Sequence, residues 1–167
     1  MHRNWQLELS LLIKLENRMD IRVTSPISED IQELFQLLDA HNLSHCPPEI
    51  CNLTQPEELS KADSILLGVL YDKKLVGMGG LKFYRDYAEV TKMFLKEAYR
   101  GKGFASGLLM ELENIARERA KHFLKLETSD RFENAVRLYE KLGFSRCEPF
   151  GEYVDKPYNS YFEKKII

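Results

Sequence analysis

The residues that could do the most specific chemistry form a glycine-bearing stretch, Arg100-Gly101-Lys102-Gly103-Phe104-Ala105-Ser106. It follows an apolar run that ends in Met93-Phe94-Leu95 and precedes a helical pattern. Glycines let a backbone approach a ligand closely, and the start of a helix presents unpaired N–H groups at the positive end of its dipole. The stretch therefore predicts a turn that binds phosphate or pyrophosphate. The alternative is a plain tight turn whose basic residues face solvent.

Two nucleotide-binding motifs can be compared with this stretch. A Walker A loop requires a glycine five residues before the Gly-Lys pair and Ser or Thr after it, where this chain has Lys96 and Gly103. A dinucleotide fingerprint fits better, with Gly101, Gly103 and then Ser106, and with Glu127 at the end of the next expected strand. That fold needs several more parallel strands, and too little chain follows Glu127 to supply them.

Hydrophobic periodicity predicts the elements that must position this turn. Three neighbouring apolar runs with turn-length links predict an antiparallel meander, and the strand–helix–strand order after them predicts a βαβ unit. The fold class is therefore α+β. The expected strands are 21–23, 64–71, 75–83, 88–95, 123–128, 144–149 and 160–165. The expected helices are 28–43 (capped by Ser28), 101–122 and 133–142, with residues 41–60 irregular around Pro47, Pro48 and Pro56.

The composition narrows the classes of protein to consider. Of the 167 residues, 44% are apolar and 30% charged, and 24 Lys and Arg against 26 Asp and Glu give a net charge of −2. This is the composition of one globular domain, and it is not basic enough to indicate nucleic acid or an anionic membrane as a partner. Three cysteines, an odd number, indicate a reducing compartment, and no apolar run approaches the ~20 residues of a membrane span. We expect a cytoplasmic protein.

The first 19 residues do not fit the pattern of the rest. Between Trp5 and Leu15 apolar residues alternate with mostly polar ones, which is typical of a strand, although helical spacing is also compatible. Glu8 and Lys14 interrupt the apolar stretch, so we do not expect a signal peptide. We expect residues 1–19 to be an extension that supplies an edge strand or a homodimer contact, and residues 20–167 to be the domain.

Two motifs together resemble the signatures of the GNAT superfamily of acyl-CoA-dependent N-acetyltransferases. Residues 100–105, Arg-Gly-Lys-Gly-Phe-Ala, match Gln/Arg-x-x-Gly-x-Gly/Ala. Residues 135–144, Ala-Val-Arg-Leu-Tyr-Glu-Lys-Leu-Gly-Phe, match Ala-Ile/Val-x-Leu-Tyr-x-x-x-Gly-Phe. The resemblance covers about residues 21–166 and is to a group of small, single-domain, bacterial-type members. It implies a mixed, mostly antiparallel twisted sheet with helices on both faces and a central βαβ unit that binds the cofactor.

The resemblance implies acetyl-CoA as co-substrate and an amine as acceptor. It implies that the end of the third meander strand pairs with the pantetheine arm, and that an N–H group nearest Phe94 polarises the thioester carbonyl. On residue type alone this is a buried strand end. Both interpretations can hold, because the implied contacts use backbone groups and not side chains. The cofactor-binding residues it implies are Met93, Phe94 and Leu95 on the strand, and Arg100, Gly101, Lys102, Gly103, Phe104, Ala105 and Ser106 around the pyrophosphate.

The resemblance also implies a general acid, Tyr139, and two candidates for a general base. A phenol has a reference pKa of about 10 and a thiol about 8.5, so Tyr139 stays protonated at neutral pH and can donate to a leaving thiolate. Glu127 resembles the base of some protein N-terminal acetyltransferases, and Glu89 lies on the strand that leads to the cofactor; either could act through one water. From residue type alone, Tyr139 is a core tyrosine and each glutamate a solvated or salt-bridged strand residue.

Members of the superfamily commonly carry an asparagine seven residues before the signature tyrosine, where this chain has Phe132, so one CoA contact is not expected here. The resemblance implies that one wall of the acceptor site comes from the segment after the first helix. The other wall comes from residues 150–159, where we note four side chains that could meet an amine. They are Glu152, Tyr153, Asp155 and Tyr158.

A group of possible metal ligands also follows the first helix. His41 and His45 have the i, i+4 spacing of a ligand pair, and Cys46 and Cys51 come next. However, two prolines intervene and Cys-x₄-Cys is an unusual zinc spacing. We expect no metal.

We therefore expect an N-acetyltransferase that moves an acetyl group from acetyl-CoA to a primary amine of a small molecule or peptide. We expect direct attack in a ternary complex rather than a covalent intermediate on Cys147, for which no histidine partner is indicated. Two alternatives stay open at this point. One is a catalytically silent acyl-CoA-binding module, and the other is a protein that binds a nicotinamide dinucleotide.

Overall fold

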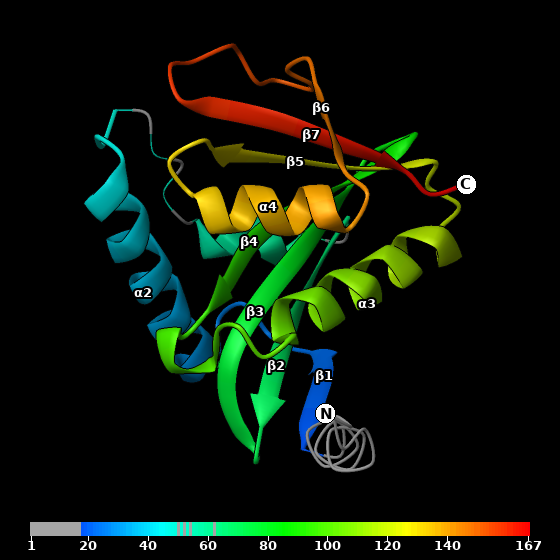
Figure 1. The fold of residues 1–167 in the computed structure, drawn as a ribbon. Helices are drawn as coiled ribbons and strands as arrows, with labels where there is room; N and C mark the ends of the chain where they lie inside the picture. The colour runs from blue at the N-terminus through cyan, green and yellow to red at the C-terminus, as the bar shows by residue number, and fades with distance from the viewer. Residues whose placement is uncertain (1–17, 50, 52, 54, 62) are drawn as a thin grey trace, which may run out of the picture.

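A seven-stranded sheet in the order β1-β2-β3-β4-β5-β7-β6 forms the framework of the chain (Figure 1). The structure is a computed structural model that describes residues 18–49, 51, 53, 55–61 and 63–167. Its strands are β1 Met19–Val23, β2 Ser64–Tyr71, β3 Lys74–Phe83, β4 Tyr87–Leu95, β5 Phe123–Ser129, β6 Ser145–Cys147 and β7 Asn159–Lys165. Its α-helices are α2 Glu29–His45, α3 Phe104–Glu118 and α4 Glu133–Lys141.

The first four strands form the antiparallel meander that the sequence predicts. Asp72 and Lys73 both adopt positive φ angles, 50° and 65°, which suit the tight turn between β2 and β3. β4 then pairs parallel to β5 with α3 as the crossover, so the predicted βαβ unit is also present. β7 lies between β5 and β6 and pairs antiparallel to both.

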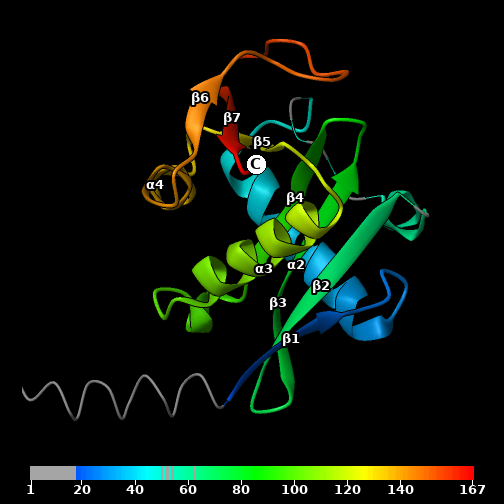
Figure 2. The ribbon, with the colours of Figure 1, turned by 90° about the vertical axis from the view of Figure 1, so that its right-hand side faces the viewer.

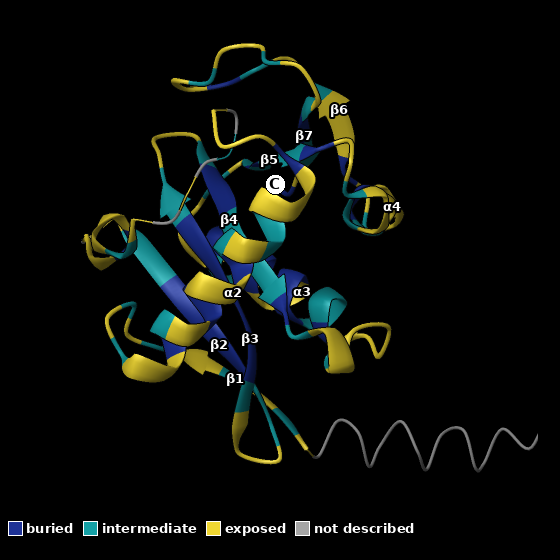
Figure 3. Ribbon diagram, turned by 90° about the vertical axis from the view of Figure 1, so that its left-hand side faces the viewer, coloured by how far each residue is buried: buried dark blue, intermediate teal, exposed yellow. Residues whose placement is uncertain are grey.

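Helices cover both faces of the sheet, as expected (Figures 1 and 2). α3 and α4 pack on one face, where Leu108 and Leu112 are fully buried against apolar residues of β2 to β5. α2 packs on the other face, where Ile31 and Leu34 are fully buried in a smaller cluster. Figure 3 shows that the central strands lie buried between these layers. The two apolar clusters pack against the sheet from both sides, and they include the end of β4, where Leu95 and Met93 face one cluster and Phe94 the other.

Several predicted boundaries differ from the observed ones, among them the end of α3, which lies at Glu118 and not at residue 122, and the cap of α2 differs as well. α2 continues to His45, because nothing before Pro47 stops it, so residues 41–45 are helical rather than irregular. α3 begins at Phe104, not at Gly101, because both glycines of the turn have positive φ angles. Ser28 is at the N-cap of α2, but its hydroxyl donates to the Ser25 carbonyl (3.0 Å) and does not cap the helix.

The prediction for residues 1–17 lies outside the described residues. Met19 begins β1 and pairs with Tyr71 at the edge of the sheet. Among the helices of the described part, none has the length and apolarity that crossing a bilayer requires.

Candidate active site

The turn between β4 and α3 is open on the side that a ligand would approach. Gly101 and Gly103 have φ angles of 72° and 85°, and a Cβ atom added to either would meet nothing within 4 Å. Gly103 is the N-cap of α3, so the amide N–H groups of Phe104, Ala105 and Ser106 have no acceptor within the helix. An open concave backbone with three unpaired donors at a helix start fits a pyrophosphate group.

Two basic side chains flank this turn. The Arg100 Nε atom donates to the Leu95 carbonyl (3.0 Å), and its guanidinium lies 5.7 Å from the Phe94 ring centroid. The Lys102 ammonium lies 5.6 Å from the Tyr99 ring centroid. Neither cation forms an ion pair with a carboxylate of the described residues. Both charges therefore remain available to an anionic ligand in the turn.

β4 separates from β5 shortly before this turn (Figure 1). The two strands pair only from Tyr87 to Glu89, so the later residues of β4, which include Met93, Phe94 and Leu95, have no strand partner on the β5 side. On the β3 side the pairing shifts between Met78 and Gly80, and Lys92 has a positive φ of 54°. This irregularity is a bulge, which reorients the backbone groups next to it. The opening and the bulge leave backbone N–H and C=O groups free to pair with an extended ligand.

Tyr139 lies on α4 with its ring buried and its hydroxyl oxygen unbonded. The ring packs on Phe144 and Phe162, and only 7% of the residue is exposed. Among the described residues, none forms a hydrogen bond with this hydroxyl, and none has a fully buried side-chain oxygen that lacks a partner. The oxygen atom therefore reaches accessible space. Burial, and secondarily the charge of Glu127, raise the pKa of Tyr139 to about 12.

The two candidate bases lie on the same face of the sheet, in different surroundings. Glu89 is opposite Lys125 in the β4–β5 ladder, and Glu127 follows Lys125 by two residues, so all three side chains point to one face. Glu127 is half-buried. Glu89 is only 4% exposed, and its carboxylate accepts hydrogen bonds from the Tyr84 hydroxyl (3.2 Å) and the Tyr153 hydroxyl (2.5 Å).

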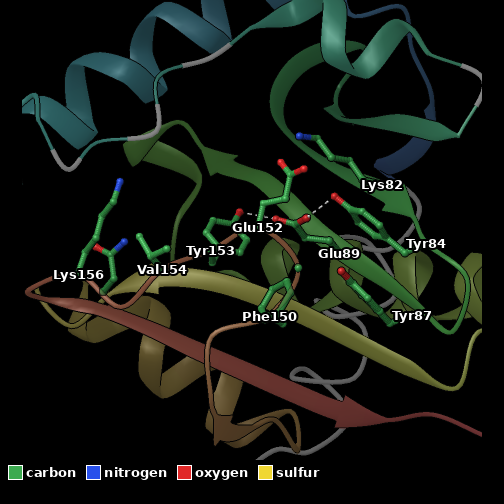
Figure 4. Close-up of a pocket in the computed structure, with 11 residues that line it drawn as sticks. Lys82, Tyr84, Tyr87, Glu89, Phe150, Glu152, Tyr153, Val154 and Lys156 are labelled. Atoms are coloured by element: carbon green, nitrogen blue, oxygen red, sulfur yellow. Dashed lines mark hydrogen bonds between the residues drawn. The ribbon is translucent and has the colours of Figure 1, made fainter.

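Glu89 forms the floor of a cavity of about 480 Å³ (Figure 4). Its walls are the rings of Tyr84, Tyr87, Phe150 and Tyr153. The sequence singled out Glu89 and Tyr153, and it placed Phe150 in the predicted acceptor wall at residues 150–159, but it missed Tyr84 and Tyr87. The signal that could have found these two is their position at the β3–β4 turn, just before the inward-facing Glu89.

The remaining predicted acceptor residues divide into two groups. Glu152 and Tyr153 line the cavity, whereas Asp155 and Tyr158 do not. The Tyr158 ring instead lies under the Arg131 guanidinium, 4.1 Å from its centroid.

The end of α2 contacts the start of α4. Phe132, at the N-cap of α4, stacks on the His41 ring, with the ring centroids 5.2 Å apart. The His45 ring centroid lies 5.1 Å from that of Phe132. Burial, then the charges of Arg100 and His45, lower the pKa of His41, so its ring is neutral at pH 7. The described residues hold no group of three His, Cys, Asp or Glu side chains arranged for a metal ion.

A family model supplies the deciding comparison. The model of the acetyltransferase (GNAT) family matches residues 28–144, which is more than half of the chain. The chain belongs to the GNAT family. It is an acyl-CoA-dependent N-acetyltransferase by family, and its sheet confirms the implied α+β fold. A dinucleotide-binding sheet would need several parallel pairs, and within the described part β4–β5 is the single one.

Individual relatives agree with this GNAT assignment. The chain is 31% identical to the uncharacterized N-acetyltransferase YedL of Escherichia coli, over 71% of this chain and 77% of that protein. It is 27% identical to the uncharacterized N-acetyltransferase YsnE of Bacillus subtilis, over 92% of this chain and 99% of that protein. Its fold is similar to that of the PaiA N-acetyltransferase of Thermoplasma acidophilum, solved in complex with coenzyme A, with a TM-score of 0.67 and 22% identity over 88% and 98% of the two chains.

Proposed function

We propose that this GNAT protein transfers an acetyl group from acetyl-CoA to a primary amine by direct attack in a ternary complex. The observation that carries the proposal is the opening between β4 and β5. At one end it reaches the glycine turn and the start of α3, and at the other it reaches Glu89 and Glu127. The proposed cofactor site and the proposed amine-binding face would thus meet along one strand.

The turn and the strand end would hold the cofactor. The N–H groups of residues 101–106 would bind the pyrophosphate, with Arg100 and Lys102 adding positive charge. The unpaired edge of Met93, Phe94 and Leu95 would hydrogen-bond to the pantetheine amides. Bound in this way, acetyl-CoA supplies an activated acetyl group and a thiolate leaving group.

A backbone N–H group beside Phe94 would polarise the acyl carbonyl. Fixed donors aimed at a carbonyl oxygen stabilise the negative charge that develops on it during attack by an amine. The bulge at Lys92 supports this role because it turns the backbone locally while the surrounding ladder with β3 stays intact.

Tyr139 would act as the general acid. Its pKa of about 12 keeps the phenol protonated at any physiological pH, and its hydroxyl has no competing hydrogen bond in the described residues. It can therefore donate its proton to the departing thiolate.

Of the two carboxylates, Glu127 is the better candidate for the base. It is half-buried, and its charge contributes to the raised pKa of Tyr139, which indicates that the two groups lie near each other across β5. Glu127 would accept the ammonium proton, directly or through a water. Glu89 instead has both oxygens bonded to tyrosines, which suits binding rather than proton transfer.

Direct attack is favoured over a covalent cysteine intermediate. Burial and the charge of Glu163 raise the pKa of Cys147, and burial also raises the pKa of Cys51. Both side chains therefore remain thiols at neutral pH, and the thiol is the unreactive form.

A panel of primary amines, assayed with acetyl-CoA by release of free thiol, tests the proposal. We expect thiol release that depends on the amine, with the acetylated amine found by mass spectrometry. Calorimetric titrations with coenzyme A and NAD accompany the assay. Coenzyme A binding without turnover of any amine would indicate the catalytically silent acyl-CoA-binding module instead. Tight NAD binding without coenzyme A binding would overturn both the transferase and the silent-module hypotheses.

A further inference from the structure

The cavity above Glu89 has no role in the transfer steps proposed so far. Three segments that are distant in sequence build it: the β3–β4 turn with Tyr84, strand β4 with Tyr87 and Glu89, and the β6–β7 connection with Phe150 and Tyr153. Figure 4 shows Glu89 between the hydroxyls of Tyr84 and Tyr153, with Phe150 and Tyr87 beside them. The cavity opens on the face of the sheet to which Glu127 also points.

The floor of the cavity is a buried carboxylate without a cation. Glu89 is 4% exposed, and no basic side chain of the described residues lies within ion-pair distance of it. Two phenol hydroxyls donate to it, and its charge, after burial, raises the pKa of both Tyr84 and Tyr153. Neutral donors offset only part of the cost of burying a charge, so the site gains most from a ligand that brings a positive one.

The walls favour an organic cation over a metal ion. Tyr84 and Tyr87 stack with centroids 4.6 Å apart, Phe150 meets Tyr87 edge-on at 5.7 Å, and Phe150 meets Tyr153 at 5.2 Å. Aromatic faces attract ammonium groups. A hard metal ion needs six or more oxygen ligands, and the carboxylates that line the cavity are Glu89 in its floor and Glu152 at its rim.

The charges at the rim do not cancel this preference. Lys82 is paired with Glu58 at 2.8 Å. The Lys125 ammonium lies 5.5 Å from the Phe150 ring centroid and 5.7 Å from that of Tyr87, but it is paired with Glu163 at 2.7 Å. Lys156 and Glu152 carry opposite charges on the rim, so the buried charge of the cavity is the negative one of Glu89.

Given the N-acetyltransferase function proposed above, on which this inference rests, we propose that the cavity binds a second, distal ammonium group of the acceptor. The acceptor class would then be a linear diamine or polyamine. Glu89 precedes Phe94, beside which transfer is proposed, by five strand residues, or roughly 16 Å between backbone positions. The Glu89 side chain and the acyl group would each take up part of this distance. A linear acceptor would span the rest, with one ammonium on Glu89 and its other amine at the acyl carbonyl.

Three amines of equal chain length test this directly: 1,6-diaminohexane, hexylamine and 6-aminohexanoate. They share the reacting amine and differ only in the distal group, which is cationic, apolar or anionic. We expect kcat/KM for the diamine to exceed that for hexylamine by about tenfold or more, and 6-aminohexanoate to be the poorest. Equal turnover of the diamine and hexylamine would overturn the inference while leaving the proposed transferase function intact.

The Glu89→Gln variant shows whether this cavity causes the preference. It keeps the side-chain volume and an oxygen that can accept from the tyrosines. We expect it to lose about tenfold or more in kcat/KM with the diamine, to change little with hexylamine, and to improve with 6-aminohexanoate. Glu111→Gln, at an exposed position on α3, is the matched control and should leave all three values unchanged. An equal loss with all three amines would make Glu89 part of the shared chemistry and would contradict the inference.

Binding measured without acetyl-CoA separates this inference from the proposed function. In NMR titrations, 1,6-diaminohexane should shift the resonances of residues around Glu89 in the wild type and much less in Glu89→Gln. That result would support the cavity's role even if no amine were acetylated. Equal binding to both proteins would overturn it even if acetylation were observed.

Discussion

At the scale of single residues, the two ionisable groups proposed to handle protons have opposite surroundings. Tyr139 is packed between Phe144 and Phe162, and burial raises its pKa, so the phenol stays protonated. Glu127 is half-buried on the opposite face of β5, and its charge contributes to the raised pKa of Tyr139. A protonated phenol and a carboxylate on the two sides of one strand suit a reaction in which one group gives a proton and the other takes one.

Replacing Tyr139 by phenylalanine should lower kcat about 100-fold, the usual contribution of a general acid. The ring packing is kept and the lost hydroxyl has no hydrogen-bond partner among the residues that the structure describes, so the melting temperature should barely change. Steady-state kinetics at saturating acetyl-CoA and thermal unfolding measure the two effects. A Tyr139→Phe enzyme with unchanged kcat would remove Tyr139 from the acid role.

At the scale of elements, the turn before α3 depends on backbone angles that side chains rarely adopt. Gly103 has φ 85° and ψ 0° and is the N-cap of α3, so its conformation directs the first amides of the helix into the open turn. Gly143, after α4, has a similar φ of 90° but lies beside Lys164, where no ligand is proposed. Both glycines therefore adopt a positive φ angle that favours glycine, and they differ in the residues that surround them.

Changing Gly103 to alanine should therefore weaken coenzyme A binding at least tenfold, because the new methyl group enters the space proposed for the pyrophosphate. Strain at positive φ should cost about 1 kcal/mol, or roughly 2–4 °C in melting temperature. Gly143→Ala should show a similar thermal loss and normal coenzyme A affinity, measured by calorimetry. If both variants lost affinity equally, general destabilisation rather than the turn would be responsible.

Local patterns in the sequence predict the elements well, and contacts between distant segments are what they miss. The meander, the βαβ unit and the positions of Gly103 and Tyr139 follow from periodicity and motifs because those signals are local. The hydrogen bonds of Tyr84 and Tyr153 to Glu89 join residues 5 and 64 positions away, and only the folded sheet brings the latter close. The bulge at Lys92 was also missed, because register is set by pairing with β3 and not by the strand's own residues.

At the scale of the whole molecule, the fold keeps several tyrosines neutral, which links its stability to pH. The pKa is raised, mainly by burial, for Tyr84, Tyr87, Tyr139, Tyr153 and Tyr161. A phenol whose pKa is higher in the folded state than its unfolded value of about 10 favours folding below that pH and loses this contribution as the pH rises above it. Lys92, whose pKa burial lowers, acts in the opposite direction, but it is a single group.

The free energy of unfolding should therefore be nearly constant from about pH 8 to 9 and fall steeply above about pH 10, because the unfolded chain releases phenol protons that the folded chain retains. Tyr139 alone, with its pKa raised to about 12, should account for about 2–3 kcal/mol of this loss between about pH 10 and 12. Urea unfolding at a series of pH values measures the slope, and Tyr139→Phe should make it shallower without lowering stability at neutral pH. A urea midpoint that did not change up to about pH 11 would show that these tyrosines have the same pKa in the folded and unfolded states. Water would then reach the cavity above Glu89 and the Tyr139 hydroxyl more freely than the packing around them implies.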